Sequence, residues 1–113
     1  MSESLYSLYL KERQGQTVIE RPEGFIAYRI YGEACEICEL YVLPDKRREG
    51  VAWSLANEVT KIALGAGVKR LFASVWFNVN GREEALQAIL AYGFGLHSSD
   101  GRSILLIKEI AEG

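Results

Sequence analysis

The chain has 113 residues, the size of a single domain, and its 49% apolar and 25% charged residues are the balance of an ordinary soluble globular protein. A formal net charge of −2, from 13 basic and 15 acidic residues, argues against a generic nucleic-acid binder, which carries a basic excess on one face. No apolar run approaches the ~18 residues that cross a bilayer, and Glu3 stands where a signal peptide has Lys or Arg, so we expect one domain over residues 1–113, no membrane partner and a cytoplasmic location.

The first part of the chain is predicted to form an antiparallel meander of strands. Apolar side chains alternate with others over residues 5–11, which is the period of a strand. Three further β-rich segments follow after turns, at residues 17–20, 25–31 and 35–43.

After Pro44 the period of the apolar positions changes. Over residues 51–64 they recur at three- and four-residue intervals, which predicts an amphipathic helix that ends at glycine. The remaining segments are predicted as a strand covered on both faces, a second helix and two final strands, at residues 71–77, 81–91, 94–97 and 103–110. The order β-β-β-β-α-β-α-β-β gives an α+β or α/β fold, a mixed sheet with flanking helices, and its first helix connects two parallel strands of a β-α-β unit.

Cys35 and Cys38 form a C-x-x-C pattern. A zinc site needs two further ligands, and His97 is the only histidine, so we expect no metal. A redox pair normally lies at the start of a helix, where the thiolate is favoured, whereas this pattern lies within a predicted strand. We therefore interpret the pair as two ordinary half-buried cysteines in a reducing compartment.

The junction between the last meander strand and the first helix, residues 40–52, is the segment that points to chemistry. It is a basic turn with one glycine that opens directly into a helix. The first turn of a helix leaves backbone N–H groups unpaired, and with the helix dipole they suit a phosphate. Gly50 has no Cβ to block a diphosphate, and the cations at residues 46–48 oppose the dipole, which favours a bound anion over a solvated surface turn.

This segment resembles the coenzyme-binding motif [RQ]-x-x-G-x-[GA] of the GCN5-related N-acetyltransferases, the GNAT family, through Arg47, Gly50 and Ala52. The resemblance covers about residues 25–110. It implies a mixed, mostly antiparallel sheet with a central β-α-β coenzyme-binding unit and two main helices, and acetyl-CoA as cosubstrate. In that family the fourth and fifth strands separate to admit the pantetheine arm, and residues 71–76 would be the fifth strand.

The resemblance also implies which residues surround the coenzyme. Backbone N–H groups of the motif would hold the pyrophosphate, and two residues of the preceding strand would pair with the pantetheine arm. An asparagine after the fifth strand would contact the arm, and Asn80 is the better match, with Asn78 as the alternative. The competing role for Asn80 is to cap the following helix. The implied coenzyme-binding residues are Leu40, Val42, Arg47, Arg48, Glu49, Gly50, Val51, Ala52, Trp53 and Asn80.

Two departures from the family pattern bear on catalysis. Many members have a proton-donating Tyr four residues before the Gly of Gly-Phe, where this chain has Ile89, and Tyr92 lies three residues further on. The helices between the family's first two strands, which wall the acceptor site, are expected to be missing, reduced or replaced by a hairpin. The acceptor site would then be wide open or closed by a second subunit, as in a homodimer.

A general base could come from Glu36 or Glu39 on the predicted strand at residues 35–43. A period of two puts them on opposite faces unless a bulge intervenes, and distance to the motif slightly favours Glu36. Either could instead be a plain solvent-facing acid. We leave His97 outside the site.

These residues support two functional hypotheses. The first is an acetyl-CoA-dependent N-acetyltransferase that acetylates a primary amine directly, with the backbone N–H of Val42 or Leu43 as oxyanion donor. The alternative is a catalytically inactive GNAT-fold binding or structural module, such as a phage- or virion-associated protein. A nucleotide-binding module has no P-loop pattern to support it. The acceptor could be a protein N-terminus, a lysine, a polyamine or an antibiotic.

Overall fold

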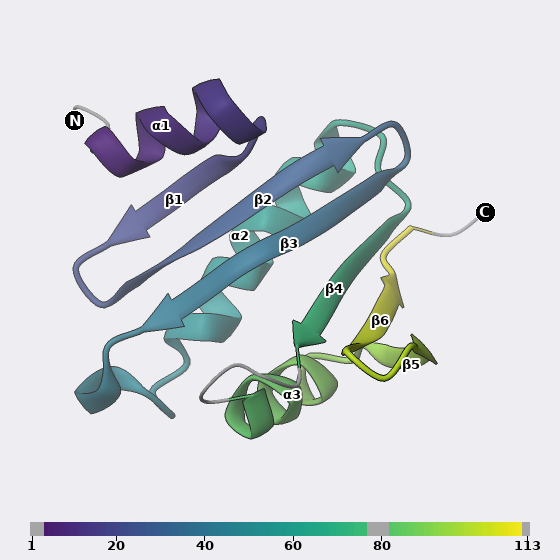
Figure 1. The fold of residues 1–113 in the computed structure, drawn as a ribbon. Helices are drawn as coiled ribbons and strands as arrows, with labels where there is room; N and C mark the ends of the chain where they lie inside the picture. Colours follow the sequence, from purple (N-terminus) through teal and green to yellow (C-terminus); the bar gives the residue numbers. More distant parts are fainter. Residues whose placement is uncertain (1–3, 77–81, 112–113) are drawn as a thin grey trace.

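The computed structural model describes residues 4–76 and 82–111, which form a six-stranded sheet and its helices (Figure 1). The elements in chain order are α1 (Leu5–Gln14), β1 (Thr17–Arg21), β2 (Gly24–Tyr31), β3 (Ala34–Val42), the 3-10 turn η1 (Pro44–Lys46), α2 (Val51–Gly65), β4 (Arg70–Trp76), α3 (Arg82–Ala91), β5 (Gly95–Ser99) and β6 (Ser103–Glu109).

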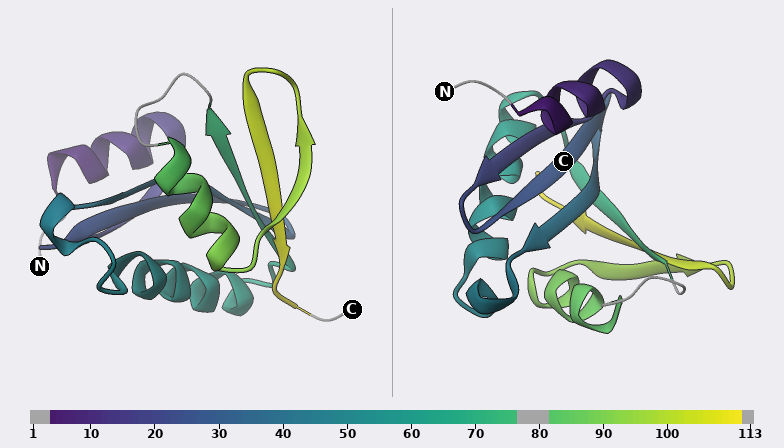
Figure 2. Two further views of the ribbon diagram at one scale, coloured as in Figure 1. Left: turned by 90° about the horizontal axis from the view of Figure 1, so that it is seen from below. Right: turned by 60° about the vertical axis from the view of Figure 1, so that its left-hand side comes forward.

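Helices cover both faces of the sheet, with α2 and α3 on one face and α1 on the other (Figure 2). The strand order is β1-β2-β3-β4-β6-β5, and every neighbouring pair is antiparallel except β3 and β4. The core lies between the sheet and α2, where Leu55, Val59 and Ala63 are fully buried against strand residues such as Ile26 and Leu71. In the described ranges no helix is both long and apolar enough to cross a membrane.

The predicted strand at residues 5–11 is wrong, because this segment is helix α1. Ser4 caps the helix by accepting a hydrogen bond at its Oγ from the N–H of Ser7 at 3.0 Å, and Gly15 ends it with φ 66°. The alternation of apolar residues gave the wrong prediction because apolar side chains of this segment face solvent. Leu5 is 86% exposed, and the buried residues are Ser7 and Leu10. The chain therefore has one helix before β1, and not a hairpin of two strands.

The predictions for the rest of the chain are confirmed in type and order, including the parallel β-α-β unit formed by β3, α2 and β4. The parallel pairing is short: it joins residues 34–37 of β3 to residues 70–73 of β4 and stops at Ile37 and Ala73. Beyond this point β3 continues to Val42 and β4 to Trp76 without pairing to each other. We call the point where the two strands part the fork, and Figure 1 shows them diverging toward their ends.

Candidate functional site

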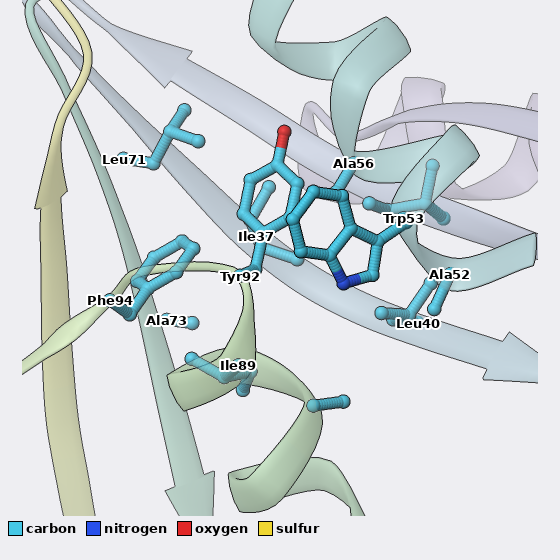
Figure 3. Close-up of a pocket in the computed structure, with 12 residues that line it drawn as sticks. Ile37, Leu40, Ala52, Trp53, Ala56, Leu71, Ala73, Ile89, Tyr92 and Phe94 are labelled. Carbon is cyan, nitrogen blue, oxygen red and sulfur yellow. The ribbon is translucent and has the colours of Figure 1, made fainter. Parts of the chain in front are cut away.

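An apolar groove lies at the fork, between the separated strands and the helices α2 and α3 (Figure 3). About 440 Å³ of space free of protein atoms lies in this groove, a volume that includes open solvent at its mouth. Its walls are side chains of β3, α2, β4 and α3, with two aromatic residues after α3: Ile37, Leu40, Ala52, Trp53, Ala56, Leu71, Ala73, Ile89, Tyr92 and Phe94.

The edge of β3 offers backbone groups to this groove. Leu43 donates its N–H to the Glu23 carbonyl at 2.8 Å, which extends the β2–β3 ladder. Because hydrogen-bonded pairs alternate in an antiparallel ladder, the backbone polar groups of Val42 and Leu40 point away from β2, toward the gap. The Val42 carbonyl there accepts a hydrogen bond from Arg47 Nε at 3.0 Å. The predicted use of the Leu43 N–H as an oxyanion donor is contradicted, because this N–H already donates to the Glu23 carbonyl.

The loop between β3 and α2 has the geometry of an anion seat. Two of its residues have positive φ, Arg48 at 67° and Gly50 at 86°, and α2 begins directly afterwards. The first helical hydrogen bond runs from the Ser54 N–H to the Gly50 carbonyl at 3.0 Å. The N–H groups of residues 51–53 therefore have no partner within the helix. Backbone N–H groups gathered in this way form a concavity that suits a phosphate.

The predicted motif residues take different places around this loop. Arg47 reaches back to β3, and its guanidinium lies 5.8 Å from the centroid of the Tyr41 ring. Arg48, Glu49 and Gly50 are exposed. Ala52 lines the groove, whereas Trp53 is 50% exposed at its mouth.

The position of the family's proton donor has no acid group. Ile89 lines the groove there. Tyr92 also lines it with its ring, but its hydroxyl donates to Asn57 Oδ1 at 2.6 Å and lies 3.1 Å from Thr60 Oγ1, both on α2. Lys108 holds the other side, with Nζ 4.0 Å from the Tyr92 ring centroid and donating to the Tyr92 carbonyl at 2.7 Å. The Tyr92 hydroxyl is thus held by hydrogen bonds to α2 and does not point into the groove.

A bulge decides where the two candidate bases point. Glu36 lies opposite Arg29 and Glu39 opposite Ala27, so Cys38 is an extra residue in β3. As a result both carboxylates lie on the α1 face, away from the groove-lining Ile37. The sequence prediction had left this open.

The two carboxylates have different partners. Glu36 forms an ion pair with Arg29 at 2.9 Å and accepts a hydrogen bond from the Tyr31 hydroxyl at 3.2 Å. Glu39 is exposed and accepts a short hydrogen bond from the Tyr6 hydroxyl of α1. That hydrogen bond, together with desolvation and the negative charge, raises the pKa of Tyr6 to about 12. Tyr6 was missed because its segment was predicted as a strand, although Ser4 marks a helix start in the sequence.

The remaining predicted residues lie outside this arrangement. Cys35 is buried and Cys38 half-buried, both are reduced, and burial raises the pKa of each thiol to about 11, which keeps it protonated at neutral pH. His97 is exposed on β5. Asn78 and Asn80 lie outside the described residues. Within the described ranges no group of three or more His, Cys, Asp or Glu side chains could hold a metal ion.

The model of the acetyltransferase (GNAT) family matches residues 3–94, and the chain belongs to this family. No curated protein sequence matches the chain.

Solved structures share the fold at low sequence identity. The PaiA N-acetyltransferase of Thermoplasma acidophilum, solved in complex with coenzyme A, has a TM-score of 0.71 and 22% identity over 77% of this chain and 53% of its own. A putative acyl-CoA N-acyltransferase from Klebsiella pneumoniae has a TM-score of 0.76 and 17% identity over 94% and 81%. The anti-CRISPR protein AcrVA5 has a TM-score of 0.66 and 20% identity over 80% and 96%. The chain thus spans about half the length of the Thermoplasma enzyme.

Proposed function

We propose that this protein is an acetyl-CoA-dependent N-acetyltransferase that transfers the acetyl group directly to a primary amine. One observation carries the proposal: the apolar groove at the fork adjoins the anion-suited loop at the start of α2, through Ala52 and Trp53. A ligand with a diphosphate at one end and a thin, flexible arm fits these two features together. The Thermoplasma relative with this fold was solved with coenzyme A.

In this proposal the diphosphate is held by the N–H groups of residues 51–53, with Arg47 and Arg48 supplying charge. The pantetheine arm lies in the groove and pairs with the backbone of Leu40 and Val42, as an added strand would. The space beside Gly50 is open to a diphosphate, since a Cβ built there would meet nothing within 4 Å.

The chemistry then needs a base for the incoming ammonium, and Glu39 is the better placed carboxylate. Glu36 is neutralised by Arg29, whereas Glu39 bonds a neutral hydroxyl and is exposed beyond the fork. Glu39 takes the proton of the ammonium, and the nitrogen lone pair attacks the thioester carbon. The tetrahedral intermediate that forms then collapses, and its carbon–sulfur bond breaks. The thiolate takes its proton from solvent, because Ile89 provides none.

Coenzyme binding is tested by thermal unfolding with and without acetyl-CoA. A ligand at about 100 times its Kd adds about 2.7 kcal/mol, which is a shift of about 10 °C for a domain of this size. Gly50→Asn should abolish the shift, because Asn tolerates a positive φ but places a side chain at the diphosphate seat. Gly67→Asn is the matched control: Gly67 has φ 84° and equally open surroundings just beyond the opposite end of α2, so its shift should persist. A full shift in Gly50→Asn contradicts the proposed seat.

The base is tested with a second matched pair, Glu39→Gln and Glu36→Gln. We expect Glu39→Gln to lower kcat by about 10²–10⁴ with little change in stability. Glu36→Gln should keep kcat but lower stability by up to about 1 kcal/mol, because the half-buried Arg29 loses its ionised partner. The reverse pattern would assign the base to Glu36.

A specific observation also favours the second candidate, a catalytically inactive GNAT-fold binding module. Ile89 occupies the usual proton-donor position, and the Tyr92 hydroxyl is held by α2. AcrVA5, of which the chain covers 96%, is an anti-CRISPR protein. The two candidates separate when coenzyme binding is measured alongside thiol release: binding without transfer to any amine supports the module.

A further inference from the structure

The side chain of Arg47 reaches back from the loop before α2 to the end of β3. The chain turns after β3 through η1, and the backbone of Arg47 is extended, with φ −72° and ψ 152° (Figure 1). Its Nε donates a hydrogen bond to the Val42 carbonyl at 3.0 Å, and its guanidinium carbon lies 5.8 Å from the centroid of the Tyr41 ring. Two residues at the end of one strand therefore hold this cation.

The Val42 carbonyl is also one of the groups that the pantetheine arm needs in the proposed function. The backbone polar groups of Leu40 and Val42 point toward the gap between the separated strands. The walls of the groove are apolar side chains, so the arm's amide groups depend on this strand edge for hydrogen bonds. Val42 is only 9% exposed, and a planar guanidinium on its carbonyl obstructs an amide that approaches the same edge.

A diphosphate is a stronger partner for Arg47 than this carbonyl. A guanidinium forms paired, charge-assisted hydrogen bonds with phosphate oxygens, whereas a peptide carbonyl carries only a partial charge. The proposed diphosphate seat, at the N–H groups of residues 51–53, follows Arg47 in the same loop, and the space beside Gly50 is open. A diphosphate bound there attracts Arg47 away from β3, which frees the Val42 carbonyl for the arm.

We propose that Arg47 is a specificity-determining residue that makes a diphosphate necessary for tight binding of the arm. The protein then selects thioesters of coenzyme A over pantetheine thioesters that lack the diphosphate. This inference rests on the proposed N-acetyltransferase function and names a determinant of its donor class. Because binding free energies are linked, the diphosphate raises the affinity for the arm by the same factor by which the arm raises the affinity for the diphosphate.

The test is isothermal titration calorimetry with two probes, coenzyme A and pantetheine, which share the arm but differ in the diphosphate. Arg47→Met keeps an unbranched side chain but removes both the donor and the charge. This variant should bind coenzyme A about tenfold more weakly than wild type, and pantetheine about three- to tenfold more tightly. The opposite signs are diagnostic, because a residue that only attracts the diphosphate would leave the affinity for pantetheine unchanged.

Lys46→Met is the matched control. Lys46 directly precedes Arg47 in the sequence, carries the same charge and is likewise exposed. Its replacement removes a positive charge from the loop but leaves the contact of Arg47 with Val42 in place. The affinity of Lys46→Met for pantetheine should therefore stay within about twofold of wild type.

The two proposals fail in different ways. Wild-type protein that does not bind coenzyme A would overturn the proposed function itself. Coenzyme A binding by wild type, with pantetheine binding by Arg47→Met that is weaker, unchanged or undetectable, would overturn only the role of Arg47. An equal gain in pantetheine affinity in Lys46→Met would overturn it as well, because the effect would then come from charge in the loop and not from the contact with Val42.

Discussion

The hydroxyl of Tyr92 provides the sharpest test of how the groove is built. Tyr92 is 7% exposed, and its hydroxyl donates to Asn57 at 2.6 Å and lies 3.1 Å from Thr60 Oγ1. Tyr92→Phe removes these contacts but keeps the ring packed against that of Trp53, with the two ring centroids 5.0 Å apart. At about 0.5–1.5 kcal/mol for each net hydrogen bond, the loss of the two contacts is about 1–3 kcal/mol.

This loss should lower the Tm by about 4–12 °C for a domain of this size, which thermal unfolding followed by circular dichroism resolves. Because the hydroxyl points to α2 and not into the groove, the kcat of acetyl transfer should stay within about twofold of wild type. Tyr31→Phe is the control, since its hydroxyl is on an exposed residue and should cost much less. A tenfold or larger fall in kcat with an unchanged Tm would refute this reasoning and make Tyr92 the proton donor.

Two further predictions concern the sheet and α1. Gly24→Ala should destabilise the fold by more than about 3 kcal/mol in urea unfolding, because a Cβ there would overlap the backbone of β3. Gly95→Ala is the control, since a Cβ at Gly95 would make only an ordinary contact. Equal losses of unfolding free energy in the two variants would contradict this packing. The pKa of Tyr6 is raised from its ordinary 10.0 to about 12 by the hydrogen bond to Glu39, so the folded chain holds this proton more tightly. The stability from this contact is full below pH 10 and is lost as the pH rises through 12, so the difference in unfolding free energy between wild type and Tyr6→Phe should shrink over that window.

The sequence predicted most of the fold because the relevant patterns are strong. In α2 the buried residues Leu55, Val59 and Ala63 recur at the helical period, and β4 is apolar except for Arg70 and Ser74. Helix α1 has no such stripe. It buries Ser7 and Leu10 while exposing leucines and tyrosines, so its apolar pattern carries no information on the face that packs.

The candidate site was only partly predictable, because part of it depends on one extra residue. The loop could be located from local chemistry, since a glycine and cations at a helix start are adjacent in the sequence. The orientation of Glu36 and Glu39 could not, because the bulge at Cys38 is set by the β2–β3 register. The contact of Glu39 with Tyr6 also joins segments 33 residues apart along the chain, whereas the ion pair of Glu36 with Arg29 spans only the β2–β3 hairpin.

The fork explains why the two halves of the site can be so different in chemistry. On the α2 face the groove is almost wholly apolar, and on the α1 face Glu39 lies among exposed rings. A continuous hydrogen-bonded sheet would separate these faces, because its ladder leaves no passage for a ligand. Pairing stops at Ile37 and Ala73, and the bulge at Cys38 follows immediately, so the opening and the turned carboxylate occur within two residues of each other. Any reaction that uses both faces must therefore take place at this point of the sheet.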